Sequence, residues 1–246
     1  MSATMTVRIA MWSGPRNIST AMMRAFENRA DCAVSDEPLY AHYLHATGID
    51  HPMREAVIAS QPVDWREVVR QITGPAPGGA TLWYQKHMTH HMIPSVGRGW
   101  FPAMRHAFLI RDPREMAASY AEKRAEATAA DLGSELQAEL YDEVNRRTGR
   151  EPPVIDAADV LRNPRRMLGL LCEALEIAFD EAMLSWPAGP RPSDGVWGEH
   201  WYAGVRASTG FRPWRPAEAC PTPELEGVAA ACEPFYRRLH ARRLLP

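Results

Sequence analysis

Residues 7–20 read VRIAMWSGPRNIST, and this stretch indicates the fold. The run from Val7 to Trp12 is apolar and partly β-branched, which is typical of a short buried strand. The run stops at Ser13-Gly14-Pro15, where glycine and proline favour a turn. Apolar side chains then recur with helical spacing, at Ile18, Met22, Met23 and Phe26. The stretch therefore predicts a strand, a tight loop and a helix in succession.

The same succession recurs along the chain. Four further apolar runs are each followed by residues with helical character: Cys32 to Ser35, Thr81 to Gln85, His106 to Ile110, and Val154 to Asp156. Such alternation is typical of a parallel sheet covered by helices on both faces. We therefore expect an α/β fold with three α/β/α layers and a central parallel sheet of about five strands.

Capping residues locate several of the helices. The expected helices are Trp65 to Ile72 after Asp64, Leu132 to Arg147 after Asp131, Arg165 to Ile177 after Asn163-Pro164, and a last helix that begins at Thr222-Pro223. Residues 186–216 show no such period and are rich in proline, glycine and tryptophan. Long irregular segments of this kind are usually functional or disordered, and the tryptophans favour a packed segment. We expect one domain over residues 1–246, with a lid-like segment at about 186–216.

Charge and hydropathy narrow the possible partners. Twenty-eight Lys and Arg against 30 Asp and Glu give a net charge of −2, which argues against a strongly basic nucleic-acid binder. No window approaches the ~20 apolar residues that a membrane helix requires, and a cytoplasmic location with a small-molecule partner is expected. The basic residues are nearly all arginine, because only Lys86 and Lys123 are lysines. The oligomeric state stays open.

The loop after the first strand has the chemistry of an anion site. Backbone N–H groups at a helix start favour an anion, the guanidinium of Arg16 can bind two oxygens, and Ser19 and Thr20 offer hydroxyl donors. A plain Gly-Pro turn capped by serine is the structural alternative. The loop is not a Walker A sequence, because Ser19 and Thr20 stand where that motif has glycine and lysine.

This loop resembles that of sulfotransferases that use 3′-phosphoadenosine 5′-phosphosulfate (PAPS), especially the bacterial branch. Pro15, Arg16, Ser19 and Thr20 match the family's 5′-phosphosulfate loop, while Asn17-Ile18 replaces its usual Ser-Gly. The resemblance implies a P-loop NTPase-like fold and PAPS as co-substrate. It also implies a donor-binding set in this loop: Gly14, Pro15, Arg16, Asn17, Ile18, Ser19 and Thr20.

Two later segments extend the resemblance over nearly the whole chain. Arg111 at a strand end and Ser119 on the next helix look like the family's 3′-phosphate site, although Arg111 could instead pair with Asp112 or Glu115. The segment Val154 to Leu175 resembles the family's strand, turn and helix. Arg206, before Ser208-Thr209-Gly210-Phe211, lies where the family places a loop on the nucleotide.

Sulfuryl transfer needs a base for the acceptor proton and a cation at the leaving oxygen. We expect Arg16 to be that cation. Two bases compete: Glu37, in a Glu-Pro motif like that of bacterial members, and His87, near the region of a catalytic histidine in the cytosolic branch. Glu37 has the closer motif and would need burial to raise its pKa. Lys86 is expected to act as an electrostatic partner.

Nearby aromatic and histidine side chains are expected to contact the acceptor, namely Tyr40, Tyr43, His90 and His91. The spacing of His87, His90 and His91 also allows a metal site, but no carboxylate or cysteine at ligand spacing completes it, and no metal is expected. The sequence thus predicts sulfuryl transfer from PAPS to a hydroxyl or amine of a small acceptor. A P-loop kinase and a non-catalytic nucleotide-binding protein are the alternatives.

Overall fold

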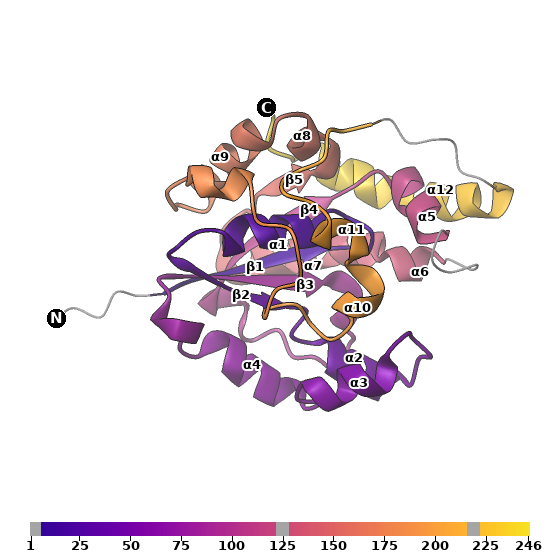
Figure 1. The fold of residues 1–246 in the computed structure, drawn as a ribbon. Helices are drawn as coiled ribbons and strands as arrows, with labels where there is room; N and C mark the ends of the chain where they lie inside the picture. Colours follow the sequence, from indigo (N-terminus) through magenta and orange to yellow (C-terminus); the bar gives the residue numbers. More distant parts are fainter. Residues whose placement is uncertain (1–5, 122–127, 216–221) are drawn as a thin grey trace.

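The computed structural model describes residues 6–121, 128–215 and 222–246. One five-stranded sheet forms the centre, with strand order β2-β3-β1-β4-β5 and every neighbouring pair parallel (Figure 1). The strands are β1 (Val7–Ser13), β2 (Cys32–Asp36), β3 (Leu82–Met88), β4 (Arg105–Ile110) and β5 (Val154–Asp156). All five were predicted from the apolar runs, and the expected α/β fold is confirmed.

Helices connect and cover these strands. The α-helices are α1 (Ser19–Glu27), α2 (Tyr40–Thr47), α3 (Arg54–Ser60), α4 (Trp65–Thr73), α5 (Pro113–Ala121), α6 (Ala129–Leu132), α7 (Ser134–Thr148), α8 (Ala157–Arg162), α9 (Pro164–Ala174), α10 (Gly198–Trp201), α11 (Ala203–Arg206) and α12 (Pro223–His240). Short 3₁₀ turns are η1 (Pro77–Gly79), η2 (Thr89–His91), η3 (Phe101–Ala103) and η4 (Glu181–Leu184). In the described ranges, no helix combines the length and apolar character needed to cross a membrane. The cytoplasmic location stays a prediction.

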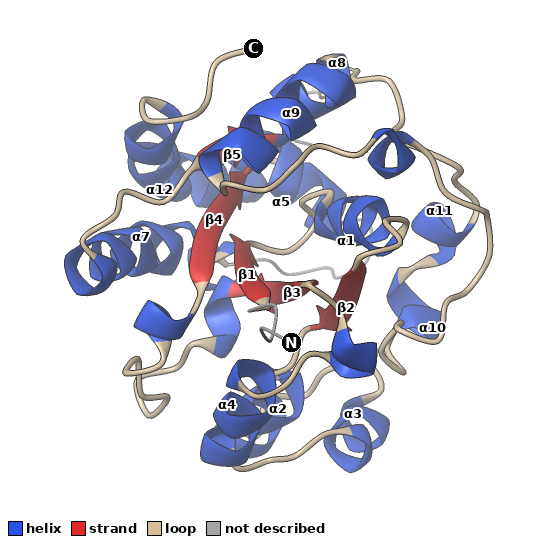
Figure 2. Cartoon of the chain, turned by 90° about the vertical axis from the view of Figure 1, so that its left-hand side faces the viewer, coloured by secondary structure: helices blue, strands red, loops and turns tan. Residues whose placement is uncertain are grey.

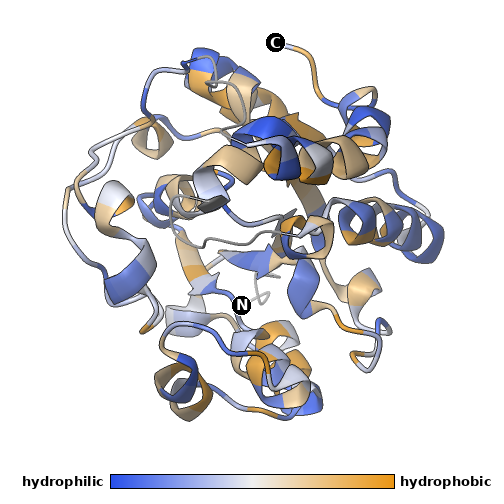
Figure 3. Cartoon of the chain, turned by 90° about the vertical axis from the view of Figure 1, so that its right-hand side faces the viewer, coloured by the Kyte–Doolittle hydropathy of each residue, from blue (hydrophilic) through white to orange (hydrophobic). Residues whose placement is uncertain are grey.

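Each face of the sheet has its own apolar core, which gives the three layers seen in Figure 2. On one face, Ile9 and Met11 of β1 pack with α1, α8 and α9. On the other, Ala10 and Trp12 of β1 pack with α4, α7 and α12. Residues of β1 alternate between the two cores because successive side chains of a strand point to opposite faces. Figure 3 shows polar and apolar segments alternating along the helices, as expected for helices with one buried face.

One predicted helix start was wrong. The chain was expected to enter a helix at Leu132 after Asp131, but that region forms the short α6, which begins with a capping box between Thr128 and Asp131. Gly133 then adopts a left-handed conformation with φ of 68° and separates α6 from α7. A Cβ at Gly133 would lie 2.8 Å from the hydroxyl of Thr89, so the break lets the chain pass close to the end of β3.

Residues 186–215, called the 186–215 segment below, cross the carboxyl edge of the sheet. They run from the α9 side towards α2 and α3 (Figure 1). Trp197 and Tyr202 of the segment pack against Tyr40, Leu44 and Val57. Arg24 of α1 also forms an ion pair with Asp194 of the segment, and the distance from Arg24 Nη2 to Asp194 Oδ1 is 2.5 Å. The expected segment extended to residue 216, which lies outside the described residues. Its action as a lid and the single-domain organisation stay predictions.

Candidate active site

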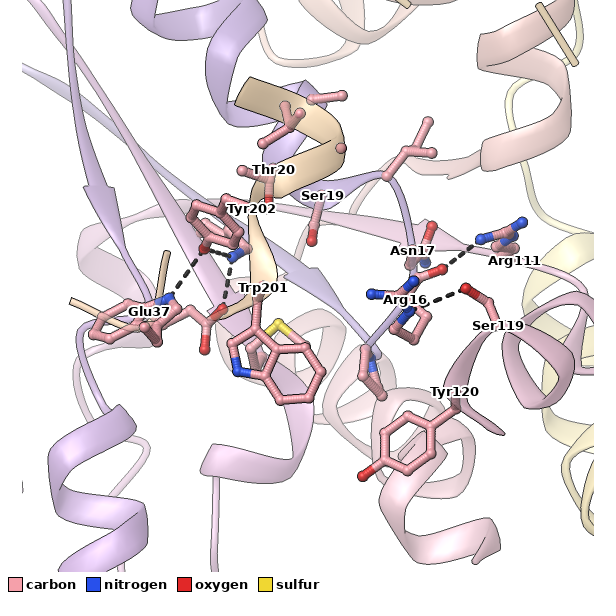
Figure 4. A pocket seen from close by; sticks show the side chains of 18 of the residues that line it. Arg16, Asn17, Ser19, Thr20, Glu37, Arg111, Ser119, Tyr120, Trp201 and Tyr202 are labelled. Carbon is pink, nitrogen blue, oxygen red and sulfur yellow. Dashed lines mark hydrogen bonds and ion pairs between the residues drawn. The ribbon is translucent and has the colours of Figure 1, made fainter. Parts of the chain in front are cut away.

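A cavity of about 440 Å³ opens at the carboxyl edge of the sheet. Because the strands are parallel, the residues that follow β1, β2, β3 and β4 all reach this edge. The cavity is lined from the β1–α1 loop, the start of α2, the end of β3, the β4–α5 junction and residues 197–212. Figure 4 shows Glu37 and Tyr202 at one end, Arg16, Arg111 and Ser119 at the other, with Ser19 and Thr20 between them.

The β1–α1 loop forms the floor of the cavity. Residues 15–20 all line it, so this part of the expected donor-binding set is brought together. Gly14 does not line the cavity; a Cβ there would lie 2.6 Å from the carbonyl oxygen of Leu132 and 2.7 Å from Met116 Cε. Gly14 therefore acts through packing, because it allows the loop to pass beneath α5 and α6.

Asn17 fixes the loop to the neighbouring strand. Its Nδ2 donates to the carbonyl oxygen of Leu109 over 2.7 Å, and only 3% of the residue is exposed. Its Oδ1 is buried with no hydrogen-bond partner among the described residues. Arg16 adopts a positive φ of 55°, which directs its side chain towards α5. Asn17, which replaces the serine of the family's usual Ser-Gly pair, thus stabilises the conformation of the loop.

Arg16, Arg111 and Ser119 converge at one end of the cavity (Figure 4). The Nε of Arg16 donates to the hydroxyl of Ser119 over 3.0 Å. The Nη1 of Arg111 donates to the carbonyl oxygen of Arg16 over 2.5 Å, and its Nε pairs with Glu115 over 2.8 Å. Arg111 therefore pairs with Glu115, which was the alternative considered from the sequence, and it also lines the cavity. Glu115 orients the guanidinium of Arg111 there.

The other end contains a buried charge cluster. The Nζ of Lys86 donates to Glu37 over 2.6 Å and to Asp36 over 2.9 Å. It also donates over 2.6 Å to the hydroxyl of Tyr202, which donates in turn to Asp36 over 2.7 Å. All four residues are less than 9% exposed. Two carboxylates share one ammonium, so the cluster carries one negative charge more than positive when both carboxylates are ionised.

These surroundings favour a proton on Glu37. Burial raises the pKa of Glu37, the ammonium of Lys86 acts to lower it, and Asp36 acts to raise it further, with a net increase. Burial alone would lower the pKa of Lys86, but Asp36 and Glu37 hold it well above its usual value. Lys86 therefore stays charged, and a proton taken up by Glu37 leaves a neutral Asp36–Lys86 pair behind.

The placement of His87 contradicts its expected role as the competing base. His87 follows Lys86 in β3 and so points to the opposite face of the sheet. There its ring lies 4.7 Å from that of Trp12 and 5.7 Å from that of Trp100, outside the cavity lining. Burial lowers the pKa of His87 to about 3. His87 belongs to an aromatic core and has no access to a substrate in the cavity.

The residues expected around the acceptor do lie together. Tyr40, Tyr43, His90 and His91 all line the cavity near Glu37. The ring of His91 stacks on those of Tyr40 and Tyr43, with centroids 4.6 and 4.9 Å away. Burial lowers the pKa of His90 to about 4 and that of His91 well below its usual value, so both imidazoles are neutral near pH 7. This wall is therefore aromatic and uncharged.

Arg206 does not reach the cavity. Its guanidinium pairs with Asp194 over 3.4 Å and with Glu199 over 3.0 Å, within the 186–215 segment itself. The expected contact of Arg206 with the nucleotide is therefore wrong in this structure, because the segment's own carboxylates bind it. Arg212 lines the cavity instead, and its Nη2 donates to the carbonyl oxygen of Gly204 over 2.9 Å.

Comparison with known proteins identifies the family. Residues 7–243 match the family model described as a sulfotransferase domain. The chain belongs to the sulfotransferase family. Two of its relatives in Arabidopsis thaliana are named branched-chain-amino-acid aminotransferase-like proteins 1 and 2. They are 37% and 34% identical over 203 and 232 residues, which cover 82% and 94% of this chain. The chain spans 36% and 41% of their lengths.

Solved sulfotransferase structures share the fold of this family member. The sulfotransferase domain from the curacin biosynthetic pathway superimposes with a TM-score of 0.52 at 14% identity, covering 98% of this chain and 99% of that one. A sulfotransferase from Alicyclobacillus acidocaldarius gives a TM-score of 0.54 at 14% identity, with 97% of each chain covered. The expected membership and the P-loop-like form of the fold are thereby confirmed.

Two residues of the charge cluster, Asp36 and Tyr202, were not singled out from the sequence. Asp36, Trp197 and Tyr202 surround Lys86 and Glu37, and the indole Nε1 of Trp197 donates to the Tyr202 hydroxyl over 3.0 Å. Asp36 could have been noticed, since it precedes Glu37 directly. Among the described residues, no group of three or more His, Cys, Asp or Glu side chains could hold a metal ion.

Proposed function

We propose that the chain transfers a sulfuryl group from PAPS to a hydroxyl or amine of a small, uncharged acceptor. The observation that carries this proposal is the polarity of one cavity. Two arginines and a serine hydroxyl converge at one end, and a buried carboxylate with a raised pKa stands at the other. Sulfuryl transfer needs both: cations for the departing phosphate and a base for the attacking group.

The donor end has groups suited to a nucleotide anion. The N-terminus of α1 faces the cavity through Ser19 and Thr20, and its first turn carries no acidic residue. Arg16 and Arg111 add two guanidiniums, which bind phosphate oxygens in pairs. In this proposal Arg16 neutralises the 5′-phosphate as it leaves, while Arg111 and Ser119 hold the 3′-phosphate. Arg212 is a further candidate for phosphate contact, in place of Arg206.

Glu37 is the proposed base. In the transfer, the acceptor oxygen or nitrogen forms a bond to sulfur as the bond between sulfur and the bridging phosphate oxygen breaks. The bonding pair leaves with the phosphate, and the acceptor proton passes to the carboxylate of Glu37. Lys86 stays protonated throughout, because Asp36 balances its charge. Protonated Glu37 thus remains beside a neutral ion pair.

The proposed acceptor is a small molecule without a formal charge. The wall near Glu37 is built from the neutral rings of Tyr40, Tyr43, His90 and His91. Such a wall binds an aromatic or amphipathic molecule through ring contacts. The nearby cation Lys86 is already bonded to Asp36, Glu37 and Tyr202.

The two alternatives make different demands on this site. A P-loop kinase would use a lysine in the phosphate loop, where this chain has Ser19 and Thr20. A non-catalytic nucleotide-binding protein would need the donor end but not Glu37.

Thermal denaturation with added nucleotides separates these proposals. A ligand at a hundredfold excess over its Kd should stabilise the fold by about 2.7 kcal/mol. We expect 3′,5′-adenosine bisphosphate to stabilise the chain without Mg²⁺. Stabilisation by ATP with Mg²⁺ and not by the bisphosphate would support a kinase and contradict the proposal. Bisphosphate binding without release of bisphosphate from PAPS, across a panel of phenols, alcohols and amines, would favour the non-catalytic alternative.

A further inference from the structure

The hydroxyl of Tyr202 occupies a central place in the charge cluster beside Glu37. It accepts hydrogen bonds from Lys86 over 2.6 Å and from the indole of Trp197 over 3.0 Å. It donates its single proton to Asp36 Oδ2 over 2.7 Å. A hydroxyl has one donor and two acceptor sites, and here all three are used. The direction of the Tyr202 hydroxyl is therefore fixed by its neighbours.

The ammonium of Lys86 is saturated in the same way. It has three N–H donors, and these meet Asp36 Oδ1, Glu37 Oε1 and the Tyr202 hydroxyl. Because no donor is left over, the third bond helps to hold the ammonium in place between the two carboxylates. The hydroxyl thus takes part in setting how the positive charge is shared between Asp36 and Glu37.

Asp36 also depends on this hydroxyl. Its Oδ1 accepts from Lys86, and its Oδ2 accepts from Tyr202 and, over 3.1 Å, from the backbone N–H of Gly195. Two of these three donors belong to the 186–215 segment. Without the segment, Asp36 would therefore retain only the hydrogen bond from Lys86.

We propose that Tyr202 is a positioning residue, which keeps Lys86 bonded to Glu37 by satisfying Asp36 from the 186–215 segment. This inference rests on the proposed role of Glu37 as the base. The 186–215 segment then helps to set the pKa of Glu37, and it also lines the cavity. Tyr202 acts through Lys86 and Asp36, and not by contact with the reacting atoms.

Tyr202→Phe isolates this role, because it removes the hydroxyl and keeps the ring. The ring centroid lies 5.0 Å from the Nζ of Lys86, so the contact between cation and ring survives. Without the hydroxyl, Asp36 Oδ2 keeps only Gly195 and Lys86 has one unbonded N–H. We expect the ammonium to turn towards Asp36 and away from Glu37. The pKa of Glu37 then rises, since Lys86 is the group that lowers it. His91, whose Nε2 lies 3.9 Å from Glu37 Oε2, stays neutral because burial lowers its pKa.

The experiment is a pH titration of the full chain with ¹³C-labelled glutamate side chains, observed by NMR. The Glu37 resonance is assigned by its loss in Glu37→Gln. We expect its titration midpoint to rise by about one pH unit in Tyr202→Phe, equivalent to ~1.4 kcal/mol. Tyr84→Phe is the matched control, because the Tyr84 hydroxyl is buried in the same strand as Lys86 and has no hydrogen-bond partner among the described residues. The Glu37 titration midpoint in Tyr84→Phe should match that of the unmodified chain.

A second variant covers the case in which Tyr202→Phe does not fold. Trp197→Phe keeps the Tyr202 hydroxyl but removes one of its donors, and it should shift the midpoint in the same direction by a smaller amount. An unchanged Glu37 midpoint in the variant that folds would overturn the proposal. So would a shift of equal size in Tyr84→Phe.

A kinetic measurement separates this inference from the proposed function. In Tyr202→Phe, the acid limb of the pH profile for sulfuryl transfer should move to higher pH, with KM for PAPS unchanged. If the unmodified chain transfers no sulfuryl group while the NMR midpoint still moves, the proposed function fails and the positioning of Glu37 by Tyr202 stands. If transfer occurs and neither the acid limb nor the midpoint moves, the function stands and the positioning role is lost.

Discussion

The Nε of Arg16 donates a hydrogen bond to the hydroxyl of Ser119 over 3.0 Å, across 103 positions of sequence. This contact joins the loop after β1 to the helix after β4. The two segments that resemble the family's 5′- and 3′-phosphate sites therefore meet at one end of one cavity. Under the proposed function, a ligand with two phosphate groups should bind at this end more tightly than a ligand with one, so the donor end can be tested without measuring sulfuryl transfer.

Arg111→Ala should weaken binding of 3′,5′-adenosine bisphosphate far more than binding of the 5′-monophosphate. The guanidinium of Arg111 is held at the cavity by Glu115 and would contact only the 3′-phosphate. Loss of a charge-assisted pair costs about 1.5–3 kcal/mol, so a loss of roughly 10- to 150-fold in bisphosphate affinity is expected by calorimetry. Arg114→Ala on the same helix is the control, because Arg114 pairs with Glu226 instead. Equal losses for the two nucleotides would show that the 3′-phosphate lies elsewhere.

Glu37→Gln should lower the rate of sulfuryl transfer by about 10²- to 10⁴-fold and leave bisphosphate affinity nearly unchanged. The amide keeps the shape of the side chain but cannot take the acceptor proton. In the unmodified chain, burial raises the pKa of Glu37, so activity should fall as the pH drops through that raised value. Rates measured from pH 5 to 9 test both points. Transfer at the original rate by Glu37→Gln would remove Glu37 from the reaction.

The same carboxyl should affect stability in the opposite sense to a carboxylate whose pKa is lowered on folding. The folded chain binds the Glu37 proton more tightly than the unfolded chain, whose glutamate titrates near 4.5. The free energy of unfolding contributed by Glu37 is therefore fully present below pH 4.5 and is lost as the pH rises through the raised folded-state pKa. Urea unfolding at several pH values should show this loss in the unmodified chain and not in Glu37→Gln.

His87→Phe should retain sulfuryl transfer, because His87 lies in an aromatic core on the other side of the sheet. Its main effect should be on acid stability. Burial lowers the pKa of His87 to about 3, whereas an unfolded histidine titrates near 6.5. The unfolded chain thus gains a proton first, and stability falls as the pH drops from 6.5 towards 3. Urea unfolding should show a shallower fall in His87→Phe than in the control His45→Gln, at an exposed position of α2. Loss of transfer with bisphosphate binding retained would return His87 to the candidate bases.

Gly14→Ala should destabilise the chain by about 1–3 kcal/mol and weaken bisphosphate binding. The added Cβ would lie 2.6 Å from the carbonyl oxygen of Leu132, and that backbone cannot move without shifting α6. Gly169→Ala in α9 is the matched control, since a Cβ there meets nothing within 4 Å, and it should stabilise the helix by roughly 0.5–1 kcal/mol. Thermal melts with and without the bisphosphate measure both effects. If Gly14→Ala binds the bisphosphate as tightly as the unmodified chain, close packing at Gly14 is not needed for the β1–α1 loop to bind it, and the prediction is wrong.

Features encoded by neighbouring residues could be predicted from the sequence. The strands follow from short apolar runs, and the placement of Arg16, Ser19 and Thr20 at the cavity follows from their position between a strand and a helix. The helix break at Gly133 was missed because the close approach that requires glycine there involves the hydroxyl of Thr89, in another part of the chain.

The charge cluster could not be predicted in full because its members are distant in sequence. Tyr202 lies 116 positions after Lys86, in a segment without periodicity that gives no direction for its side chain. His87 is a different case. Alternation along a strand already implies that Lys86 and His87 face opposite sides, but β3 is buried on both faces and its apolar pattern does not tell which side holds the site. Arg206 and Arg212 were likewise indistinguishable, because the ion pairs of Arg206 form only after the segment folds.

The strand order gives the two halves of the cavity separate origins. The residues of the proposed anion site follow β1 and β4, whereas Asp36, Glu37 and Lys86 lie on or directly after β2 and β3. The aromatic wall comes from α2 and η2, and the 186–215 segment lines the cavity beside it; all three are peripheral to the β1–β4 pair. Under the proposed function, substitutions in that periphery would change which acceptor is used while the donor end keeps its geometry. A scaffold divided in this way is suited to diversification, in which new acceptor specificities arise by changing the outer elements around an unaltered donor half.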